Sequence, residues 1–503
     1  MFPAARIAAT GLATGVFLLL AQAPATGPMD MKMFKAIHEE AYDHSQADAI
    51  FDMLTVNIGP RLTASPAHKR AAEFAQERLA AFGLENARLE PWQFGRGWTQ
   101  EKLVVEMVEP RYLPLIGYAD GWSPSTSGEL TATPVFLGGK TPEAVDAMKG
   151  SLKGAIVMTQ PLMTSFIRKD RPNPSDPNYT PNGAAYATSV GNAGRGRGTA
   201  STAPTAAQRI AALLREAGAG VILKPSAGEH GTVFVTGRDE GPGAVPTVTL
   251  SGEHYNMIVR MLEKGIAVKL RVNLQTRYYD SEGGKAYNVV AELPGSDPAV
   301  RDEVVMIGAH IDSWHTGVGA TDNADGSTTV MEAMRILKAV GARPRRTIRV
   351  ALWGGEEQGL LGSRAWVKEH LAGDANKAAR EKMDVYLNTD NGTGPVYGWY
   401  MENRAALVPL FDAWLGPLKE YGARRNNMEP VGSTDHLSFN DVGVPGFNPI
   451  QDYSNYDIRT HHTNVDTADR LSVQDIRQAA MSFAWFAYNM AMAEQKIPRA
   501  AAK

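Results

Sequence analysis

Cysteine is missing from the 503 residues of this chain. Disulfide bonds are therefore excluded, as are thiolate metal sites and lipid attachment to an N-terminal cysteine. Any transition metal that the chain binds tightly must be held by imidazole and carboxylate groups, a ligand set that suits zinc, manganese or cobalt. An exported protein without disulfides must be stabilised by its apolar core, and a chain of this length is long enough to form one.

An excess of charge of one sign is also missing, since 51 Lys and Arg residues are balanced by 54 Asp and Glu, a formal net charge of -3. This balance gives no electrostatic reason to expect binding to nucleic acid or to an anionic membrane surface. The charge runs are short and mixed, which is typical of solvated faces, and the sequence has no internal repeat.

The first residues have the layout of a secretory signal peptide. Arg6 is followed by an apolar stretch that runs to Leu20 and then by small residues in AQAPA, up to about Ala25. The apolar stretch is near the lower limit for spanning a bilayer, so we favour a cleaved signal over an uncleaved anchor. We therefore expect an exported protein, either periplasmic or extracellular.

A strand–loop–helix–strand unit organises the centre of the chain. Val304–Gly308 and Thr347–Trp353 are apolar runs of strand length, which suits strands buried on both faces of a parallel sheet. Between them, apolar residues recur at helical spacing: Val330, Met334, Leu337 and Val340. This is the pattern of a βαβ unit. In open α/β sheets the chemistry gathers beyond the carboxyl ends of the strands, so these ends should face one crevice.

Carboxylates and imidazoles follow these strand ends. His310 and Asp312 lie two residues apart, so that one can ligate a metal while the other hydrogen-bonds the ring. Asp322 follows in the glycine-rich loop GVGATDNADG, where it can point back and bridge two metals. The adjacent Glu356 and Glu357 point in different directions, so that one can bind metal while its neighbour acts as general base.

The set is completed further along the chain. Asp390 follows another apolar run in DVYLNTDNG, and His461 and His462 lie in THHTNVDT, shortly before a final helical segment. An H-x-D or E-E pair alone is usually a solvated surface feature. Their joint placement at strand ends within one unit favours a functional site.

Taken in order, H-x-D, D-N-A, E-E-Q-G-x-x-G-S, an Asp after a strand and H-T-x-x-D-T resemble the motifs of the co-catalytic zinc exopeptidase family. The family includes secreted bacterial aminopeptidases, glutamate carboxypeptidase and carboxypeptidase Q, and HIDSWHTGVGATDN with RPRRTIRVALWGGEEQG is most similar to its carboxypeptidase Q branch. The resemblance implies two zinc ions per chain, with cobalt or manganese as substitutes. It implies these ligands: His310, Asp322, Glu357, Asp390 and His462. It further implies Asp322 as the bridge, Glu356 as the base and Asp312 as the partner of His310.

The resemblance also implies an inserted domain. From about Tyr112 to Tyr278, short β-like runs are separated by Gly and Pro, with one clear helix at Ala206–Ala217. LKGAIVMTQ and REAGAGVILKP resemble the protease-associated domain found in several family members. A Pro- and Gly-rich loop at 168–202 is either a functional lid or disordered.

We therefore expect an α/β fold, with a mostly parallel, doubly wound sheet as the catalytic domain and a β-rich protease-associated insert. The expected divisions are a signal peptide at 1–25, the catalytic domain at 30–115 and 276–495, and the insert at 116–275. The insert should contribute no metal ligand. We also expect these elements: a helix at Pro66–Phe82, a strand at Ala286–Gly295, an amphipathic helix at Ala405–Tyr421 and a closing helix at Ser472–Ala493 with Ser472 as its N-cap.

Three residues bear on the substrate. His461 occupies the position where some relatives have a Tyr that donates to the developing oxyanion, and an imidazole can do the same. Asp435 and His436 either contact substrate or serve as a loop-capping Asp and a surface His. The D-H-x-x-F segment that contains them resembles the aminopeptidases, whereas the metal motifs resemble carboxypeptidase Q. The sequence therefore supports exopeptidase action on dipeptides and short peptides more strongly than it supports a carboxypeptidase or an aminopeptidase in particular.

Two alternatives come from other classes of protein. A non-catalytic receptor on the same fold would have lost ligands, and here five ligands and the base are present. A glutaminyl-cyclase-like acyltransferase shares the fold but uses one zinc and lacks the insert. Association into a homodimer stays open.

Overall fold

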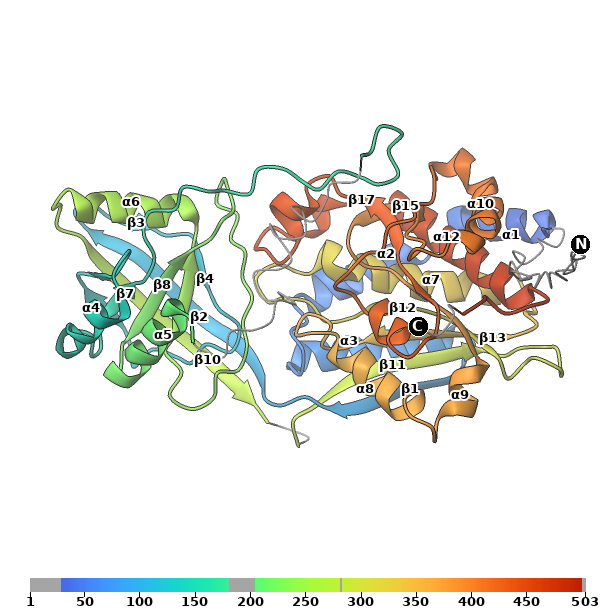
Figure 1. The fold of residues 1–503 in the computed structure, drawn as a ribbon, viewed down its shortest axis with the longest axis horizontal. Helices are drawn as coiled ribbons and strands as arrows, with labels where there is room; N and C mark the ends of the chain where they lie inside the picture. Colours follow the sequence, from blue (N-terminus) through green and yellow to red (C-terminus); the bar gives the residue numbers. More distant parts are fainter. Residues whose placement is uncertain (1–28, 181–203, 281–282, 500–503) are drawn as a thin grey trace, which may run out of the picture.

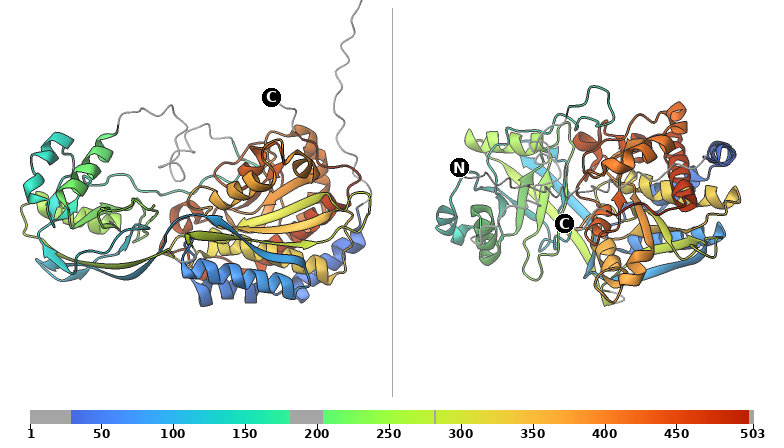
Figure 2. Two further views of the ribbon diagram at one scale, coloured as in Figure 1. Left: turned by 90° about the horizontal axis from the view of Figure 1, so that it is seen from below. Right: turned by 45° about the vertical axis from the view of Figure 1, so that its right-hand side comes forward.

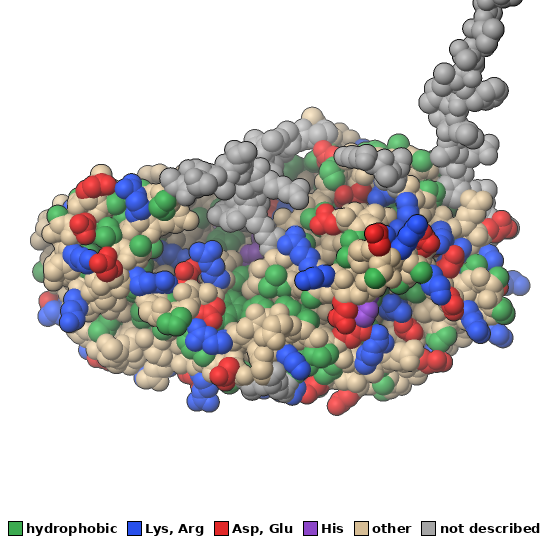
Figure 3. Space-filling view, turned by 60° about the horizontal axis from the view of Figure 1, so that its bottom comes forward, with side chains coloured by type: hydrophobic (Ala, Val, Ile, Leu, Met, Phe, Trp, Pro, Cys, Tyr) green, Lys and Arg blue, Asp and Glu red, His purple; other side chains and the backbone are tan. Residues whose placement is uncertain are grey.

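The computed structural model describes residues 29–180, 204–280 and 283–499 and has two lobes, one formed mainly by the segment between residues 97 and 279 (Figure 1). The expected signal peptide and residues 181–203 of the 168–202 loop lie outside the described residues. Within them, no helix has both the length and the apolar character needed to cross a membrane. Acidic and basic side chains are interspersed over the face shown in Figure 3, as the balanced composition predicts.

The larger lobe is built on a six-stranded sheet of order β1-β11-β13-β12-β14-β16. The strands are β1 (Glu85–Gln93), β11 (Lys285–Leu293), β12 (Val304–His310), β13 (Thr347–Trp353), β14 (Met383–Asn388) and β16 (Gly446–Phe447). β12, β13, β14 and β16 pair in parallel, whereas β1 and β11 are antiparallel additions at one edge. The sheet is therefore mixed, with a parallel half that contains the expected βαβ unit.

Helices cover both faces of this sheet, so it is doubly wound. On one face, α3 (Pro66–Ala81), α7 (Asp325–Ala339) and α12 (Val473–Met492) pack against the strands, and α1 (Met31–Asp43), α2 (Ala47–Asp52) and α10 (Val408–Leu415) share the same core by packing on α7 or α12. The other face packs against α8 (Leu361–His370) and α11 (His436–Asn440), and α9 (Lys377–Lys382) leads into β14. Alternate residues of the central strands point to opposite faces: Val305 and Ile307 lie in the first core, Val304 and Met306 in the second. Burial on both faces explains the continuous apolar runs.

The smaller lobe contains two further sheets. Its antiparallel sheet has the order β3-β2-β10-β5, and its other sheet the order β4-β9-β8-β7-β6. The strands are β2 (Gly97–Glu109), β3 (Leu113–Pro114), β4 (Gly117–Ala119), β5 (Leu130–Ala132), β6 (Val135–Phe136), β7 (Ile156–Met158), β8 (Val221–Pro225), β9 (Thr247–Leu250) and β10 (Lys269–Tyr279). The helices are α4 (Pro142–Asp146), α5 (Ala206–Ala217) and α6 (Gly252–Glu263). The long strands β2 and β10 pair and lead from one lobe to the other (Figure 2).

The local expectations meet two exceptions. The helix expected at Ala405–Tyr421 is broken into a 3₁₀ turn at Ala405–Leu407, α10 and a 3₁₀ turn at Pro417–Tyr421, because Pro417 has no N–H to continue the α-helical ladder. In the smaller lobe the sequence predicted one clear helix, Ala206–Ala217, and the structure has α4 and α6 in addition to it. α12 begins after Ser472, whose side chain accepts a hydrogen bond from the Gln474 N–H, so the predicted N-cap is confirmed.

A segment of the smaller lobe returns to the larger one. Residues 159–180, here called the strap, follow β7 and run across the top of the view in Figure 1 onto the larger lobe. There Asn173 donates to the Gln451 carbonyl and Tyr179 donates to Glu429. β15 (Thr393–Trp399) and β17 (Pro449–Asp452) pair beside this contact in a small separate sheet.

Candidate metal centre and active site

Three neighbouring parallel strands bring the candidate residues to one edge of the sheet. His310 is the last residue of β12, Glu356 and Glu357 follow β13, and Asp390 follows β14 by two residues. Because β12 lies between β13 and β14 and all three are parallel, their carboxyl ends meet at that edge. The placement of these residues beside one another is what the sequence pattern predicts.

Asp322 lies at the centre of the group. It comes from a distorted turn, Ala320–Ala324, that precedes α7, and its peptide bond to Asn323 is cis. One carboxylate oxygen, Oδ1, lies 3.2 Å from His310 Nε2, which is itself 3.6 Å from Asp390 Oδ1. The other, Oδ2, lies 3.4 Å from His462 Nε2, which is 2.9 Å from Glu357 Oε2. Asp322 thus joins two groups of potential ligands, each containing one imidazole.

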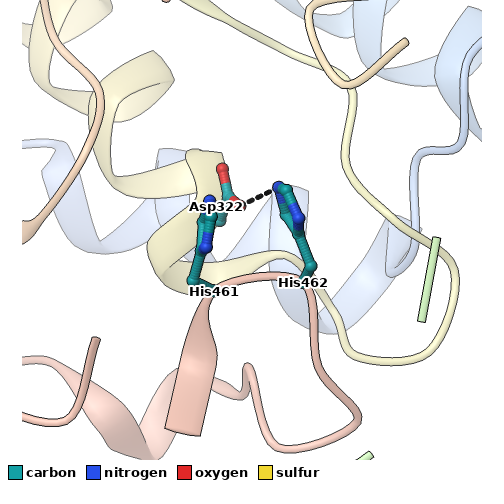
Figure 4. A group of neighbouring side chains, drawn as sticks. All are labelled: Asp322, His461 and His462. Atoms are coloured by element: carbon teal, nitrogen blue, oxygen red, sulfur yellow. Dashed lines mark ion pairs between the residues drawn. The ribbon is translucent and has the colours of Figure 1, made fainter. Parts of the chain in front are cut away.

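His462 reaches Asp322 from a distant loop. It lies beyond a π-helical turn, Tyr456–Thr460, and Figure 4 shows Asp322, His461 and His462 close together, with the ion pair running from Asp322 to His462. The two imidazole rings are stacked, with centroids 3.8 Å apart. Two sets of side chains have the spacing of metal ligands among the described residues: His310 with Asp322 and Asp390, and Asp322 with His461 and His462. Neither set includes a residue of the 116–275 segment.

The donor atoms fit a pair of cations. His310 Nε2, Asp322 Oδ2 and both carboxylate oxygens of Glu357 are buried and have no hydrogen-bond partner among the described residues, although they lie close to one another. Buried polar atoms are normally paired, because an unpaired one loses its interaction with water without replacement. A set of unpaired imidazole and carboxylate atoms gathered at one point is a donor set that suits zinc.

The pKa values reflect this concentration of charge. Burial opposes the protonation of His310, but Asp390, Asp312 and Asp322 outweigh it and raise its pKa well above the usual value. Burial likewise opposes protonation of His462, and Glu357 and Asp322 nevertheless raise its pKa to about 9. Burial raises the pKa of Glu357 to about 7, with a further contribution from Asp322. The site is therefore strongly negative and attracts positive charge.

Glu356 and Asp312 lie behind this group. Burial raises the pKa of Glu356 well above its usual value, and Asp390 adds to the increase while His310 opposes it. A base with a raised pKa is better matched to proton transfer near neutral pH. Asp312 accepts hydrogen bonds from the backbone N–H groups of Glu356 and Glu357, at 3.2 and 3.4 Å, and so fixes the turn after β13.

The link between Asp312 and His310 involves the backbone as well. His310 Nδ1 lies 3.0 Å from the carbonyl oxygen of Asp312 and 3.5 Å from its carboxylate. The carboxylate also accepts from the Thr63 hydroxyl at 2.8 Å. Asp312 therefore orients His310 and the Glu pair together.

The three residues considered for substrate contact lie in different surroundings. The pKa of His461 is well below its usual value because of burial and the neighbouring His462 and Arg171, so the ring is neutral. Asp435 and His436 are both fully buried, so the prediction of a surface His at position 436 is wrong. Asp435 accepts a hydrogen bond from the Ser363 hydroxyl, and His436 Nε2 lies 3.1 Å from the Val431 carbonyl.

Three further residues belong to the site although the sequence pattern did not single them out. Asp466 accepts from the N–H groups of Thr321 and Asp322 and so anchors the bridging residue. Tyr456 has a buried hydroxyl without a partner among the described residues, and its ring lies 5.1 Å from that of His461. The D of H-T-x-x-D-T was the available signal for Asp466. No local signal marked Tyr456.

Arg61 is the third of these residues. It is fully buried, and its guanidinium donates to five backbone carbonyls, those of Leu54, Gly59, Ile311, Val318 and Gly319. The last three of these residues lie between His310 and Asp322 in the sequence. Gly319 adopts φ +59°, and a Cβ there would meet Ser313 at 2.3 Å, so this turn requires glycine. Arg61 therefore holds the loop between two ligands.

Known proteins share both the sequence pattern and the fold. Residues 288–487 match the model of peptidase family M28. Carboxypeptidase Q from Bos taurus is 26% identical over 447 residues, covering 89% of this chain and 85% of that protein. A peptidase M28 precursor from Shewanella amazonensis has a crystal structure that is 28% identical, covers 94% of this chain and 99% of its own, and has a TM-score of 0.69.

A third protein resembles the fold alone. The zinc aminopeptidase BSAP from Bacillus subtilis is 18% identical, with a TM-score of 0.56 and coverage of 87% of this chain and 92% of that one. The family match spans the strand ends and His462, so all five expected ligands lie within it.

Proposed function

Because this chain belongs to peptidase family M28, a family of zinc metallopeptidases, we propose that it is an exported di-zinc exopeptidase that hydrolyses dipeptides and short peptides in the manner of carboxypeptidase Q. One observation carries the proposal. The two oxygens of Asp322 face two different imidazoles, those of His310 and His462, each accompanied by a further carboxylate. A bridging carboxylate between two ligand groups is the arrangement of two-metal hydrolases.

The ligands divide into two groups around this bridge. His310 and Asp390 would hold one zinc ion, His462 and Glu357 the other, and Asp322 both. When bound, the two ions would polarise the scissile carbonyl and lower the pKa of the attacking water. Cobalt or manganese would suit the same nitrogen and oxygen ligands.

The protein itself supplies the proton transfers. Glu356 takes the proton of the attacking water and passes it to the leaving amine, a role that its raised pKa favours. Negative charge develops on the carbonyl oxygen of the substrate as the water attacks, before the amine leaves. The neutral His461 and the phenol of Tyr456 are the side chains we propose as hydrogen-bond donors to it, since neither His461 Nδ1 nor the Tyr456 hydroxyl is otherwise engaged among the described residues.

The proposed surroundings of the site follow from the same reasoning. We propose that the 116–275 segment is a protease-associated domain that shapes access to the crevice, and that peptides are the partners of the site. Neither nucleic acid nor a stable membrane contact is part of the proposal. The protein would act in the periplasm or outside the cell.

The first test is a panel of dipeptides with free, blocked N-terminal or blocked C-terminal ends, assayed with and without a chelator. We expect hydrolysis of free dipeptides that is lost on chelation and restored by zinc. Cleavage of N-blocked but not C-blocked substrates would identify a carboxypeptidase, and the reverse would identify an aminopeptidase, the alternative direction. Turnover in a verified metal-free preparation would contradict the metallopeptidase proposal.

Metal content separates the alternatives of other classes. Two ions per chain fit the proposed exopeptidase, one ion would favour a glutaminyl-cyclase-like acyltransferase, and none would favour a receptor-like protein. Elemental analysis of the purified chain gives this number directly.

The direction of attack is expected to depend on the crevice wall, because the two metals would polarise any scissile carbonyl in the same way. Asp435 is fully buried, but together with burial and Asp390 it raises the pKa of Glu356, so its charge acts on the site and Asp435→Asn should change the ratio of kcat/KM between N-blocked and C-blocked dipeptides. Ser363→Ala is the matched comparison, since it removes the hydrogen bond that Asp435 accepts but leaves the carboxyl group itself in place. An unchanged ratio in the Asp435 variant, with a lower Tm, would leave this buried residue with a structural role only.

A further inference from the structure

The strap of the smaller lobe is bound to the turn that precedes His462. The Asp170 carboxylate accepts from the backbone N–H groups of Asn455, at 2.8 Å, and Ile458, at 3.1 Å. The adjacent Arg171 donates to the Asp457 carboxylate from its backbone N–H at 2.8 Å and from its guanidinium Nε at 2.9 Å, with a further bond from Nη2. Two consecutive strap residues are therefore hydrogen-bonded to the start and the middle of this turn.

The Arg171–Asp457 pair is buried at its carboxylate and partly exposed at its guanidinium. The Asp457 side chain is only 1% exposed, and Arg171 also lies over the Tyr453 ring, 4.8 Å from its centroid. A bidentate Arg–carboxylate pair fixes geometry as well as charge. Removing one member of such a pair leaves an uncompensated buried charge, so the pair resists separation.

A second segment of the smaller lobe holds the far side of the same loop. The Val235 N–H donates to the carbonyl oxygen of His462 at 2.9 Å, and the Val233 N–H donates to the side chain of Asn464 at 2.7 Å. Phe234 and Thr463 form an isolated antiparallel bridge. Residues 455–466, here called the His462 loop, are thus held on two sides by the smaller lobe.

His462 needs such support because its backbone is strained. It adopts φ +61°, in the left-handed region that non-glycine residues rarely occupy. Residues in such conformations persist only when their surroundings hold them there. The Val235–His462 hydrogen bond lies at the strained residue itself, and the smaller lobe provides it.

From these contacts we propose that the smaller lobe holds His462 in its ligating position, and that the strap pair Asp170–Arg171 thereby sets the affinity of the metal position formed by Asp322, Glu357 and His462. The lobe contributes no ligand to this position, but it fixes one. His310 ends β12 and Asp390 follows β14 by two residues, so the sheet, rather than the strap, positions them. The inference rests on the proposed two-metal site.

The test is a zinc or cobalt titration of the chelator-treated full chain, read by calorimetry and by the cobalt absorption spectrum. The native chain should bind two ions. In Arg171→Met the second binding step should weaken by about 10- to 100-fold, the usual effect of losing a residue that orients a metal ligand, while the first step keeps its native affinity. His462→Ala provides the one-ion reference toward which the Arg171→Met curve should move.

Arg96→Met is the matched control. Arg96 forms a two-bond pair with Asp239, at 2.8 and 2.7 Å, that includes no residue of the strap or of the His462 loop and is more exposed than the Arg171–Asp457 pair. It should bind both ions as the native chain does. If Arg171→Met bound both ions with native affinity, or if both steps weakened equally, the proposal would be overturned. Should Arg171→Met fail to fold, Asp170→Ala, which leaves the Arg171–Asp457 pair in place, is judged by the same criteria.

Failure of the proposed function gives a different result. A native chain that binds fewer than two ions would contradict the two-metal exopeptidase. A native chain and an Arg171→Met variant that both bind two ions tightly would contradict only the role of the strap. The stoichiometry of binding separates the two without any measurement of activity.

Discussion

Replacing Glu356 with Gln is expected to lower turnover by about 10² to 10⁴ while the metal content stays at its native value. The amide keeps the size and polarity of the side chain but cannot accept the proton of the attacking water. The ligands around Asp322 are untouched, so a small residual rate should remain. Turnover and metal content, measured on the same preparation, check this result.

Glu357→Gln is the matched comparison, because it makes the same chemical change at the next residue. Glu357 Oε2 lies 2.9 Å from His462 Nε2, within the second ligand group, so this variant should lose metal as well as activity. If Glu356→Gln lost its metal and Glu357→Gln kept it, the two roles would have to be exchanged. Full activity in both variants would place the active site elsewhere.

Arg61→Met is expected to destabilise the fold by several kcal/mol, because each buried carbonyl that is left without a donor costs about 1–3 kcal/mol. The five carbonyls that Arg61 contacts would lose a charged donor, and Met cannot replace it. Burial lowers the pKa of Arg61 to about 10, with Asp466 and Asp312 opposing, so the side chain stays charged at neutral pH. Denaturant unfolding of chelator-treated protein measures the change without a contribution from metal binding.

Arg238→Met is the control for this substitution. Arg238 is 81% exposed and pairs with Glu240 two residues away, so its removal should change stability little. Equal stability of the Arg61 and Arg238 variants would show that the segments whose carbonyls Arg61 contacts do not depend on the buried guanidinium.

Much of the site follows from the sequence alone. The apolar runs of β12, β13 and β14 mark strands buried on both faces, and parallel neighbours must end at the same edge of a sheet. His310, Glu356 and Asp390 each follow such a run, so their meeting is a consequence of local pattern and sheet topology. The absence of cysteine then restricts the ligand set to nitrogen and oxygen.

Local pattern was insufficient wherever a contact joins distant parts of the chain. Arg171 and Asp457 are 286 residues apart, and Arg61 and Gly319 are 258 apart. Within its own segment, each of these residues has the local sequence of an ordinary charged or loop position. Only the tertiary structure brings them together: the contact between the lobes places Arg171 beside Asp457, and the packing within the larger lobe places Arg61 beside Gly319.

The same holds for the details of the metal centre. The sequence made Asp322, Glu357 and His462 candidate ligands, because each belongs to a motif that resembles those of the zinc exopeptidase family. Only the tertiary structure decided that the two oxygens of Asp322 face different imidazoles, that Asp466 anchors Asp322, and that Asp435 is turned inward to Ser363. The physical reason is that hydrophobic periodicity specifies which face of an element is buried, whereas the direction of a buried polar side chain depends on partners that only the folded chain brings within hydrogen-bonding distance.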